Sequence, residues 1–292
     1  MDKKNEPSVS SIHYPIFQHS TIPLFHPENK LNTLDRSALK IKNNLPHFEI
    51  PEFVRITWIR HAFLTRQGGV SLSPYNSLNL SDKNGDREEL VSKNRQIVAE
   101  TFGFDSSHLI LLDQIHQDRI LLLKKPITSL PSPLEFDALI TNSPNTFLGI
   151  LTADCLPIFV ADQKKKVIAA IHAGRQGTAL GITAKALRKM EGAFGCRSKD
   201  LFIAIGPSIG PFCYEIDEKV FQQGWKPFST SRGVGKWMVD LARINIGQMK
   251  REGIEEKQIC CVNLCTHCHS DLFFSYRKES RTGRQLSFIG MI

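Results

Sequence analysis

The chain has 292 residues, 41% of them hydrophobic and 23% charged, which is enough apolar content for a sizeable core and excludes a disordered chain. Its net charge of +8 would suit an anionic partner, but the basic residues are scattered and no nucleic-acid-binding motif occurs, so we expect no binding to nucleic acid. No apolar stretch has the length of a membrane span, and the basic N-terminus lacks the apolar segment of a secretory signal. Seven cysteines, an odd number at modest density, favour reduced thiols and a cytoplasmic protein. We expect a monomer or a small homo-oligomer that does not contact a membrane.

Residues 1–50 differ in composition from the rest of the chain. They are rich in Ser, Pro, Asn, Lys and His and show little periodicity, which predicts a loosely ordered N-terminal extension. Residues 51–292 contain no Pro- or Gly-rich linker and no internal repeat. We therefore expect a single catalytic domain over residues 51–292.

Two periodicities alternate along this domain. Alternating or continuous apolar runs predict strands over residues 53–66, 109–116, 119–125, 147–162, 165–174, 201–210, 271–279 and 285–292. Apolar residues at helical spacing predict helices over residues 87–103, 178–195 and 236–253. The lysines at 164–166 are expected in a hairpin turn. Strands and helices follow no strict βαβ order, so we predict the α+β class, as a mixed α/β sandwich in which mixed β-sheets are flanked by helices.

Cys155 and His172 lie at or near the ends of two apolar runs, and His116 lies in a polar break between two others. Functional residues collect at such strand ends, because a rigid sheet holds a side chain that a loop exposes. One cysteine and two histidines would form a three-ligand zinc set with an open fourth position. A buried thiol and hydrogen-bonded turn histidines would explain the same residues without a metal, and their wide sequence spacing does not decide between the two interpretations.

A metal-independent cysteine hydrolase is a further interpretation of these residues. Cys155 would be the nucleophile and His172 the base, with Asp154 or another carboxylate orienting the histidine. Copper is less expected than zinc, because the single HxH pair of the chain, His267 and His269, does not supply a multicopper site. A cytidine-type zinc deaminase is excluded, because the CxxC of this chain does not follow a proline.

A second group of metal-binding residue types lies near the C-terminus. Its members are Cys260, Cys261, Cys265, His267, Cys268 and His269. A CxxC flanked by histidines is typical of zinc sites, and this segment alone contains enough candidates for the four ligands of a closed site. A local zinc site and a cluster of reduced thiols both fit the pattern.

Two polar, turn-rich segments contain candidate substrate-binding residues. Arg66 and Asn79 in residues 63–86 would reach an anion or a sugar hydroxyl. Arg277, Arg281 and Arg284 in the last segment would hold phosphate, since guanidinium groups bind phosphate oxygens in pairs. Ordinary solvated loops would have the same composition.

Several short segments, taken together and in this order, resemble the YfiH-like laccase-domain family, formerly labelled polyphenol oxidases and now regarded as zinc-dependent purine nucleoside phosphorylases. They extend over roughly residues 55–290 and are TRQGGVS (65–71) with SLNL (77–80), QIH (114–116), DALIT (137–141), LTADCLP (151–157), HAG (172–174), IGP (205–207), and FSYR (274–277) with TGR (282–284).

The resemblance implies that His116, Cys155 and His172 bind zinc at the catalytic centre. It also implies a cytoplasmic enzyme that cleaves adenosine, inosine and methylthioadenosine with phosphate and that can deaminate adenosine. We expect purine nucleoside and phosphate as its partners. Within this hypothesis Arg66 acts in catalysis and neutralises phosphate together with Arg284, while Asn79 orients the ribose.

One departure from the family lies directly after His172. The family continues His-Ala-Gly with Trp-Arg-Gly, whereas this chain has Arg175, Gln176 and Gly177. Gln176 offers neither the charge nor the paired donors of arginine. An alternative is therefore a catalytically altered protein that binds its ligand or edits peptidoglycan precursors.

Overall fold

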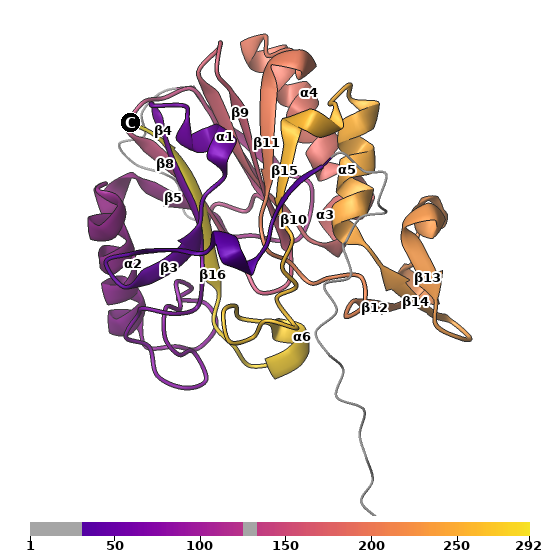
Figure 1. Cartoon of the computed structure of the whole chain (residues 1–292), viewed down its shortest axis with the longest axis horizontal. Helices are drawn as coiled ribbons and strands as arrows, with labels where there is room; N and C mark the ends of the chain where they lie inside the picture. The colour runs from indigo at the N-terminus through magenta and orange to yellow at the C-terminus, as the bar shows by residue number, and fades with distance from the viewer. Residues whose placement is uncertain (1–30, 125–132) are drawn as a thin grey trace, which may run out of the picture.

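Two large β-sheets lie face to face, and helices cover the outer face of each (Figure 1). The computed structural model describes residues 31–124 and 133–292. A third, smaller sheet lies at one side of this sandwich (Figure 1). The mixed α/β sandwich predicted from the sequence is confirmed.

The larger sheet has seven strands and a mixed pattern of directions. In spatial order its strands are β1 (Asn32–Leu34), β15 (Ile259–Val262), β11 (Leu201–Ile205), β9 (Leu156–Asp162), β10 (Val167–Ala173), β7 (Ala138–Thr141) and β6 (Ile120–Leu123). Strands β11, β9, β10 and β7 pair antiparallel, while the pairs at both edges are parallel.

The second sheet has six strands, and the third has three. The six-stranded sheet contains β2 (Lys40–Lys42), β3 (Leu45–Phe48), β4 (Ile59–Leu64), β16 (Gln285–Met291), β8 (Thr146–Thr152) and β5 (Leu109–Leu111). Only the β5–β8 pair of this sheet is parallel. The small antiparallel sheet contains β12 (Glu215–Asp217), β14 (Lys236–Val239) and β13 (Ser229–Ser231).

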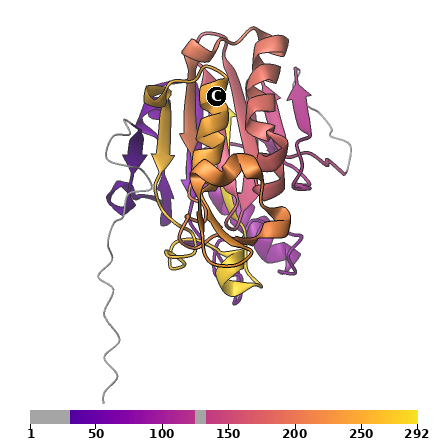
Figure 2. The same cartoon turned by 90° about the vertical axis from the view of Figure 1, so that its right-hand side faces the viewer.

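Helices pack on the outer faces because each presents an apolar stripe to a sheet. On the seven-stranded sheet lie α4 (Ile182–Phe194) and α5 (Leu241–Arg251), which are neighbours in Figure 2. On the six-stranded sheet lies α2 (Glu88–Phe102). The short helices are α1 (Pro51–Val54), α3 (Arg175–Leu180) and α6 (Tyr276–Glu279). Single 3₁₀ turns span Arg36–Ala38, Ser106–His108, Ser198–Asp200, Glu218–Val220, Gln223–Phe228 and Glu256–Gln258.

The main core fills the space between the two large sheets. Phe63 on β4 and Phe159 on β9 stack there with ring centroids 4.7 Å apart, and both are fully buried. Strands β9 and β10 are buried along their whole length, since one face meets this core and the other meets α4. Their continuous apolar sequences follow from burial on both faces.

Several predicted elements differ from the structure. The first predicted strand begins with helix α1, and the predicted helix over 178–195 is interrupted at Gly181, which has a left-handed φ of 77°. Residues 236–253 form strand β14 and then α5, because the Asp240 side chain caps the helix by accepting from the Arg243 N–H. Residues 271–279 form a buried loop and helix α6 rather than a strand. The hairpin turn over 164–166 lies as expected between β9 and β10.

The N-terminal extension was expected to reach residue 50, but strands already form within residues 32–48. Strand β1 pairs with β15 at the edge of one sheet, and β3 is buried between β2 and β4 in the other. These strands have only three or four residues, so no periodicity marks them in the sequence. Residues 1–30 lie outside the described part of the chain. Within that part, no helix is both long and apolar enough to span a membrane.

Candidate metal centre and active-site cavity

The three predicted metal ligands lie where the chain passes between the two large sheets. Cys155 is in the turn between β8 and β9, and His172 is near the end of β10. Because β10 pairs antiparallel with β9, His172 stands opposite Pro157, two residues after the cysteine. His116 lies in the loop from β5 to β6. Three segments that are far apart in the sequence therefore meet at the start of β9 and the end of β10.

The donor atoms of His116, Cys155 and His172 all lie within 4.8 Å of one another. The two imidazole rings meet edge to face, with centroids 4.8 Å apart and an interplanar angle of 84°. Gly174 makes this approach possible, since a Cβ there would come within 3.2 Å of both the Cys155 Sγ and the His116 ring. The three side chains thus converge on one point.

Asp137 holds this arrangement from behind. Its buried carboxylate accepts hydrogen bonds from His172 Nδ1 (2.8 Å), the His116 N–H (2.9 Å) and the Gln117 N–H (2.7 Å). The bond to Nδ1 leaves the Nε2 atom of His172 for a metal or for the thiol, as carboxylates behind metal-binding histidines do. The two backbone bonds fix His116 in a left-handed conformation with a φ of 59°.

The same contacts shift the pKa values of the centre. Burial alone would raise the pKa of Cys155, but the charge and hydrogen bonds of His172, together with His116, lower it to about 6. Burial alone would lower the pKa of His172, but the Cys155 thiolate and the Asp137 carboxylate raise it to about 9. Burial alone would raise the pKa of Asp137, but the hydrogen bonds from His172 and from the backbone N–H groups of Gln117 and His116 lower it. The centre therefore favours a thiolate, the form in which cysteine binds a metal.

One thiolate and two imidazoles form a donor set that can bind a metal ion. Three protein ligands leave one position of a tetrahedral ion open, as in catalytic rather than structural zinc sites. The softness of the thiolate and the imidazole nitrogens suits zinc, and these residues supply no second adjacent metal position. The donor set fits the ion implied by the sequence resemblance.

Asp154 is not the carboxylate that orients His172. Its Oδ1 accepts from the hydroxyls of Thr266 (2.6 Å) and Ser275 (2.7 Å), and its Oδ2 accepts from the Arg277 N–H (2.7 Å). Asp154 thus ties the β8–β9 turn to the loop after β15. Sequence reasoning missed the role of Asp137, although an acidic residue directly before a buried strand is a usable signal.

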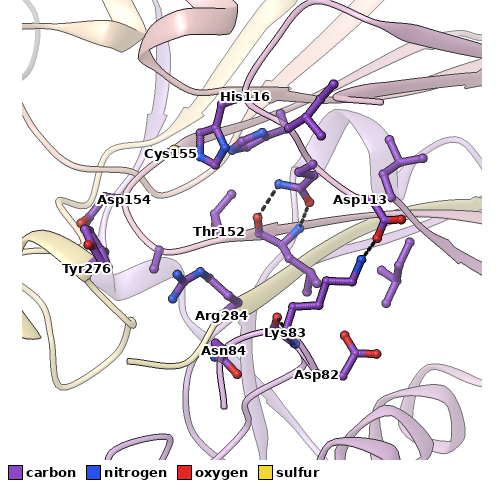
Figure 3. Close-up of a pocket in the computed structure, with 18 of the residues that line it drawn as sticks. Asp82, Lys83, Asn84, Asp113, His116, Thr152, Asp154, Cys155, Tyr276 and Arg284 are labelled. Carbon is purple, nitrogen blue, oxygen red and sulfur yellow. Dashed lines mark hydrogen bonds and ion pairs between the residues drawn. The ribbon is translucent and has the colours of Figure 1, made fainter. Parts of the chain in front are cut away.

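A cavity of about 1490 Å³ opens over the three donors. Its walls contain the arginines 175, 277 and 284 and the tyrosines 214 and 276. Figure 3 shows Arg284 between the pair His116 and Cys155 and the loop with Asn84. The site therefore combines a metal donor set with cationic and aromatic walls, a combination suited to a ligand with an anion and a flat ring.

Arg284 and Tyr214 are partly withdrawn from solvent, whereas Tyr276 is 59% exposed. Burial lowers the pKa of Arg284, and its guanidinium lies 5.9 Å from the Tyr276 ring. Arg277 lies 5.1 Å from the Tyr214 ring. Burial and the nearby Cys155 thiolate raise the pKa of Tyr214 to about 12, so this phenol keeps its proton. The tyrosines were not singled out from the sequence.

Two predicted site residues do not line the cavity. Arg66 is 8% exposed, and its guanidinium is bonded to Glu279 (2.7 Å) and to the carbonyls of Asn76 and Ser270. Asn79 is fully buried, and its side-chain amide forms hydrogen bonds with Ser81 and Asp86 in the same loop. Both residues shape the loops behind the cavity, and Asn79 does so partly by accepting from the Arg284 N–H at 2.9 Å.

Arg175 and Gln176, which replace the family's Trp-Arg, begin helix α3 and both line the cavity. A positive charge therefore remains at this wall despite the change of sequence. Arg175 also lies close enough to Tyr214 to affect its titration.

The comparisons with known proteins agree with this fold. A family model described as multi-copper polyphenol oxidoreductase laccase matches residues 60–292. A purine nucleoside phosphorylase of Bacteroides thetaiotaomicron is 36% identical over 79% of this chain and 91% of its own. The purine nucleoside phosphorylase YlmD of Bacillus subtilis is 31% identical over 78% of this chain and 87% of its own.

Solved structures resemble the whole sandwich. The hypothetical protein YfiH of Bacillus licheniformis has a TM-score of 0.78 and 31% identity, with 87% of this chain and 99% of that chain covered. YlmD from Geobacillus stearothermophilus has a TM-score of 0.79 and 27% identity, with 87% and 98% covered. The chain therefore belongs to the multi-copper polyphenol oxidoreductase laccase family, in its YfiH-type branch.

Proposed function

We propose that the protein is a zinc-dependent purine nucleoside phosphorylase that acts on adenosine, inosine and methylthioadenosine. The names of its relatives support the reaction class. The observation that carries the proposal is the cavity, in which the donor set of His116, Cys155 and His172 faces arginine and tyrosine side chains. A binding protein without catalysis would not require a three-ligand centre with an open position.

The reaction joins a phosphate oxygen to C1′ of the ribose while the bond from C1′ to the base nitrogen breaks. The products are ribose 1-phosphate and the free base, which takes up a proton. Arg284 would hold the phosphate, since its half-buried guanidinium is poorly solvated and offers paired donors. Arg175 and Arg277 would balance the remaining charge from the other wall.

The tyrosines at 214 and 276 would contact the flat parts of the nucleoside, the purine above all. When bound, zinc would supply a Lewis acid at its open position. Asp137 would keep His172 in the tautomer that leaves Nε2 as the donor. The deamination of adenosine implied by the resemblance would instead add water to C6 of the purine and release the amino group as ammonia, which leaves inosine.

A product analysis tests the proposal. The purified protein is incubated with adenosine, with and without phosphate, and bases and nucleosides are separated by chromatography. Adenine that forms only with phosphate is the expected result, and inosine reports deamination. Absence of both products from protein with a full complement of zinc would overturn the proposal and favour a ligand-binding role.

A pair of arginine variants sharpens this test. Arg284→Ala should reduce kcat/KM for phosphate about ten- to hundredfold, since one charged hydrogen bond contributes about 1.5–3 kcal/mol. Arg281→Ala is the matched control, because Arg281 belongs to the same loop but donates to the Tyr75 hydroxyl and is not among the lining residues. Equal losses in both variants would argue against phosphate binding by Arg284.

A metal-independent cysteine hydrolase is the second candidate. It is favoured by the chain of contacts from the Cys155 thiolate through His172 to Asp137, which matches the nucleophile, base and orienting carboxylate of such enzymes. Chelation separates the candidates, because removal of the metal should abolish phosphorolysis and leave a thiol-dependent hydrolase active.

A further inference from the structure

A second group of metal-binding side chains lies away from the cavity centre, between the loops that follow β11 and β15. These two strands are parallel neighbours, so both loops leave the same edge of the sheet. Backbone pairing joins the two loops. Ser208 and Cys265 form an isolated parallel β-bridge, and the Thr266 N–H donates to the Ser208 carbonyl (3.0 Å). Cys213 comes from the first loop, and Cys265, His267 and Cys268 come from the second.

Three donor atoms of this cluster lie close together. Those of Cys213, His267 and Cys268 lie within 4.8 Å of one another, and the Sγ atoms of Cys213 and Cys268 are 3.4 Å apart. Cys265 lies against both of these thiols. Two thiolates on one tetrahedral zinc ion, each at about 2.3 Å, are separated by about 3.8 Å, so small side-chain movements would suffice.

The backbone around Cys265 also fits a metal ligand. The Gly210 N–H donates to the Cys265 Sγ at 3.1 Å, which would orient a coordinating thiolate and stabilise its charge. A Cβ at Gly210 would lie 3.2 Å from the Cys265 Cβ, so a larger residue would crowd this approach. Cys260 and Cys261 do not take part, because both are buried within β15.

We propose that Cys213, Cys265, His267 and Cys268 bind a structural zinc ion that ties the loop after β11 to the loop after β15. Four protein donors, three of them thiolates, form a closed site without an open position for substrate. The site would hold two walls of the cavity in register, since Tyr214 follows Cys213 directly and Tyr276 and Arg277 lie in the chain after Cys268.

A pair of thiols 3.4 Å apart could instead be oxidised to a disulfide, whose S–S bond is about 2.05 Å long. A disulfide would use two of the four side chains and leave Cys265 and His267 without a role. The convergence of Cys213, His267 and Cys268, with Cys265 beside the two thiols, favours the metal.

Metal analysis of the full chain tests this proposal. Protein purified with a phosphine reductant and without chelators is compared as wild type, Cys155→Ala, Cys268→Ser and the double variant. Cys268→Ser should lower bound zinc by one ion per chain, in the wild type and in the Cys155→Ala background alike. Because each comparison differs only at Cys268, the result does not depend on whether the cavity holds zinc or acts as a phosphorylase.

Cys196→Ser serves as the control, since Cys196 is a buried cysteine outside the cluster and should keep all bound zinc. Unchanged zinc content in Cys268→Ser would overturn the proposal. So would a mass, measured on protein purified without reductant, that shows Cys213 joined to Cys268 by a disulfide.

A spectroscopic measurement covers the case in which Cys268→Ser does not fold. Cys155→Ala retains the whole cluster but has no thiolate in the cavity. Loaded with Co²⁺, this variant should show intense thiolate-to-cobalt charge-transfer absorption in the near ultraviolet and the visible bands of a tetrahedral ion. A spectrum without thiolate bands would exclude metal binding by the cluster.

Discussion

The substitution Asp137→Asn should weaken the metal centre without removing any ligand. Asp137 accepts three hydrogen bonds, from His172 Nδ1 and from two backbone N–H groups. An asparagine has one acceptor oxygen, and its NH₂ group cannot accept a hydrogen bond, so at least one of these donors loses its partner. His172 Nδ1 and the His116 N–H share one oxygen, so an asparagine oxygen there keeps both bonds but leaves the Gln117 N–H unpaired and removes the negative charge behind the His172 ring.

The size of the effect follows from these contacts. Loss of the group behind a metal-binding histidine lowers metal affinity about 10- to 100-fold, or about 1.4–2.7 kcal/mol. The unpaired buried donor should lower the free energy of unfolding by about 1–3 kcal/mol in the metal-free protein. Zinc affinity is measured by competition with a chromophoric chelator, and stability by urea unfolding of the metal-free chain.

Asp162→Asn is the control for loss of a buried carboxylate. Asp162 lies at the far end of β9 from Cys155, where it accepts from the N–H groups of Lys164 and Lys165. The zinc affinity of the Asp162→Asn variant should equal that of the wild type. Zinc affinity of Asp137→Asn within about twofold of the wild type, or an equal loss in both variants, would refute the role given to Asp137.

Further substitutions test other parts of the structure. Cys155→Ala should abolish activity together with zinc binding at the cavity, and full zinc with lost activity would instead indicate a nucleophilic cysteine. Asn79→Ala should reduce the free energy of unfolding by about 2–4 kcal/mol, since several buried bonds of about 1 kcal/mol are lost, whereas a pure change in KM would indicate contact with the ribose. Burial raises the pKa of Asp240 to about 6, so the folded protein binds this proton more tightly than the unfolded chain, and stability is lost as pH rises from about 4 through 6. Asp240→Asn keeps the cap of α5 and should stabilise the protein by up to about 3 kcal/mol at pH 7 but not at pH 4, as urea unfolding at both pH values would show.

The elements predicted best are those whose burial leaves a local pattern. Strands β9 and β10 are apolar throughout because both of their faces are covered, and α2 ends at Gly103 in a left-handed conformation. The apolar run Leu272–Phe274 is equally buried but lies in a loop, and its partners include Arg66 and Phe48, which are distant in the chain. A local apolar run indicates burial and does not by itself indicate a strand.

The candidate site, too, was only partly predictable from local sequence. The residue types of His116, Cys155 and His172 suggested a metal, but the strand register and the bond from His116 to Asp137 bring them together. Arg66 and Asn79 were expected in the site because their polar loop looked exposed. Both turn inward to partners about 200 residues away, a pairing that no local pattern contains.

The position of the donors at the passage from one sheet to the other has a consequence for folding. Cys155 lies between β8 of the six-stranded sheet and β9 of the seven-stranded sheet, while His172 belongs to the second sheet alone. Cys155 and His116 both lie in segments that run from the six-stranded sheet into the seven-stranded sheet, so the donor set should reach its final geometry, and bind metal most tightly, once the two sheets have docked. A metal bound at this junction would then slow unfolding more than it speeds folding, because it stabilises contacts that form last.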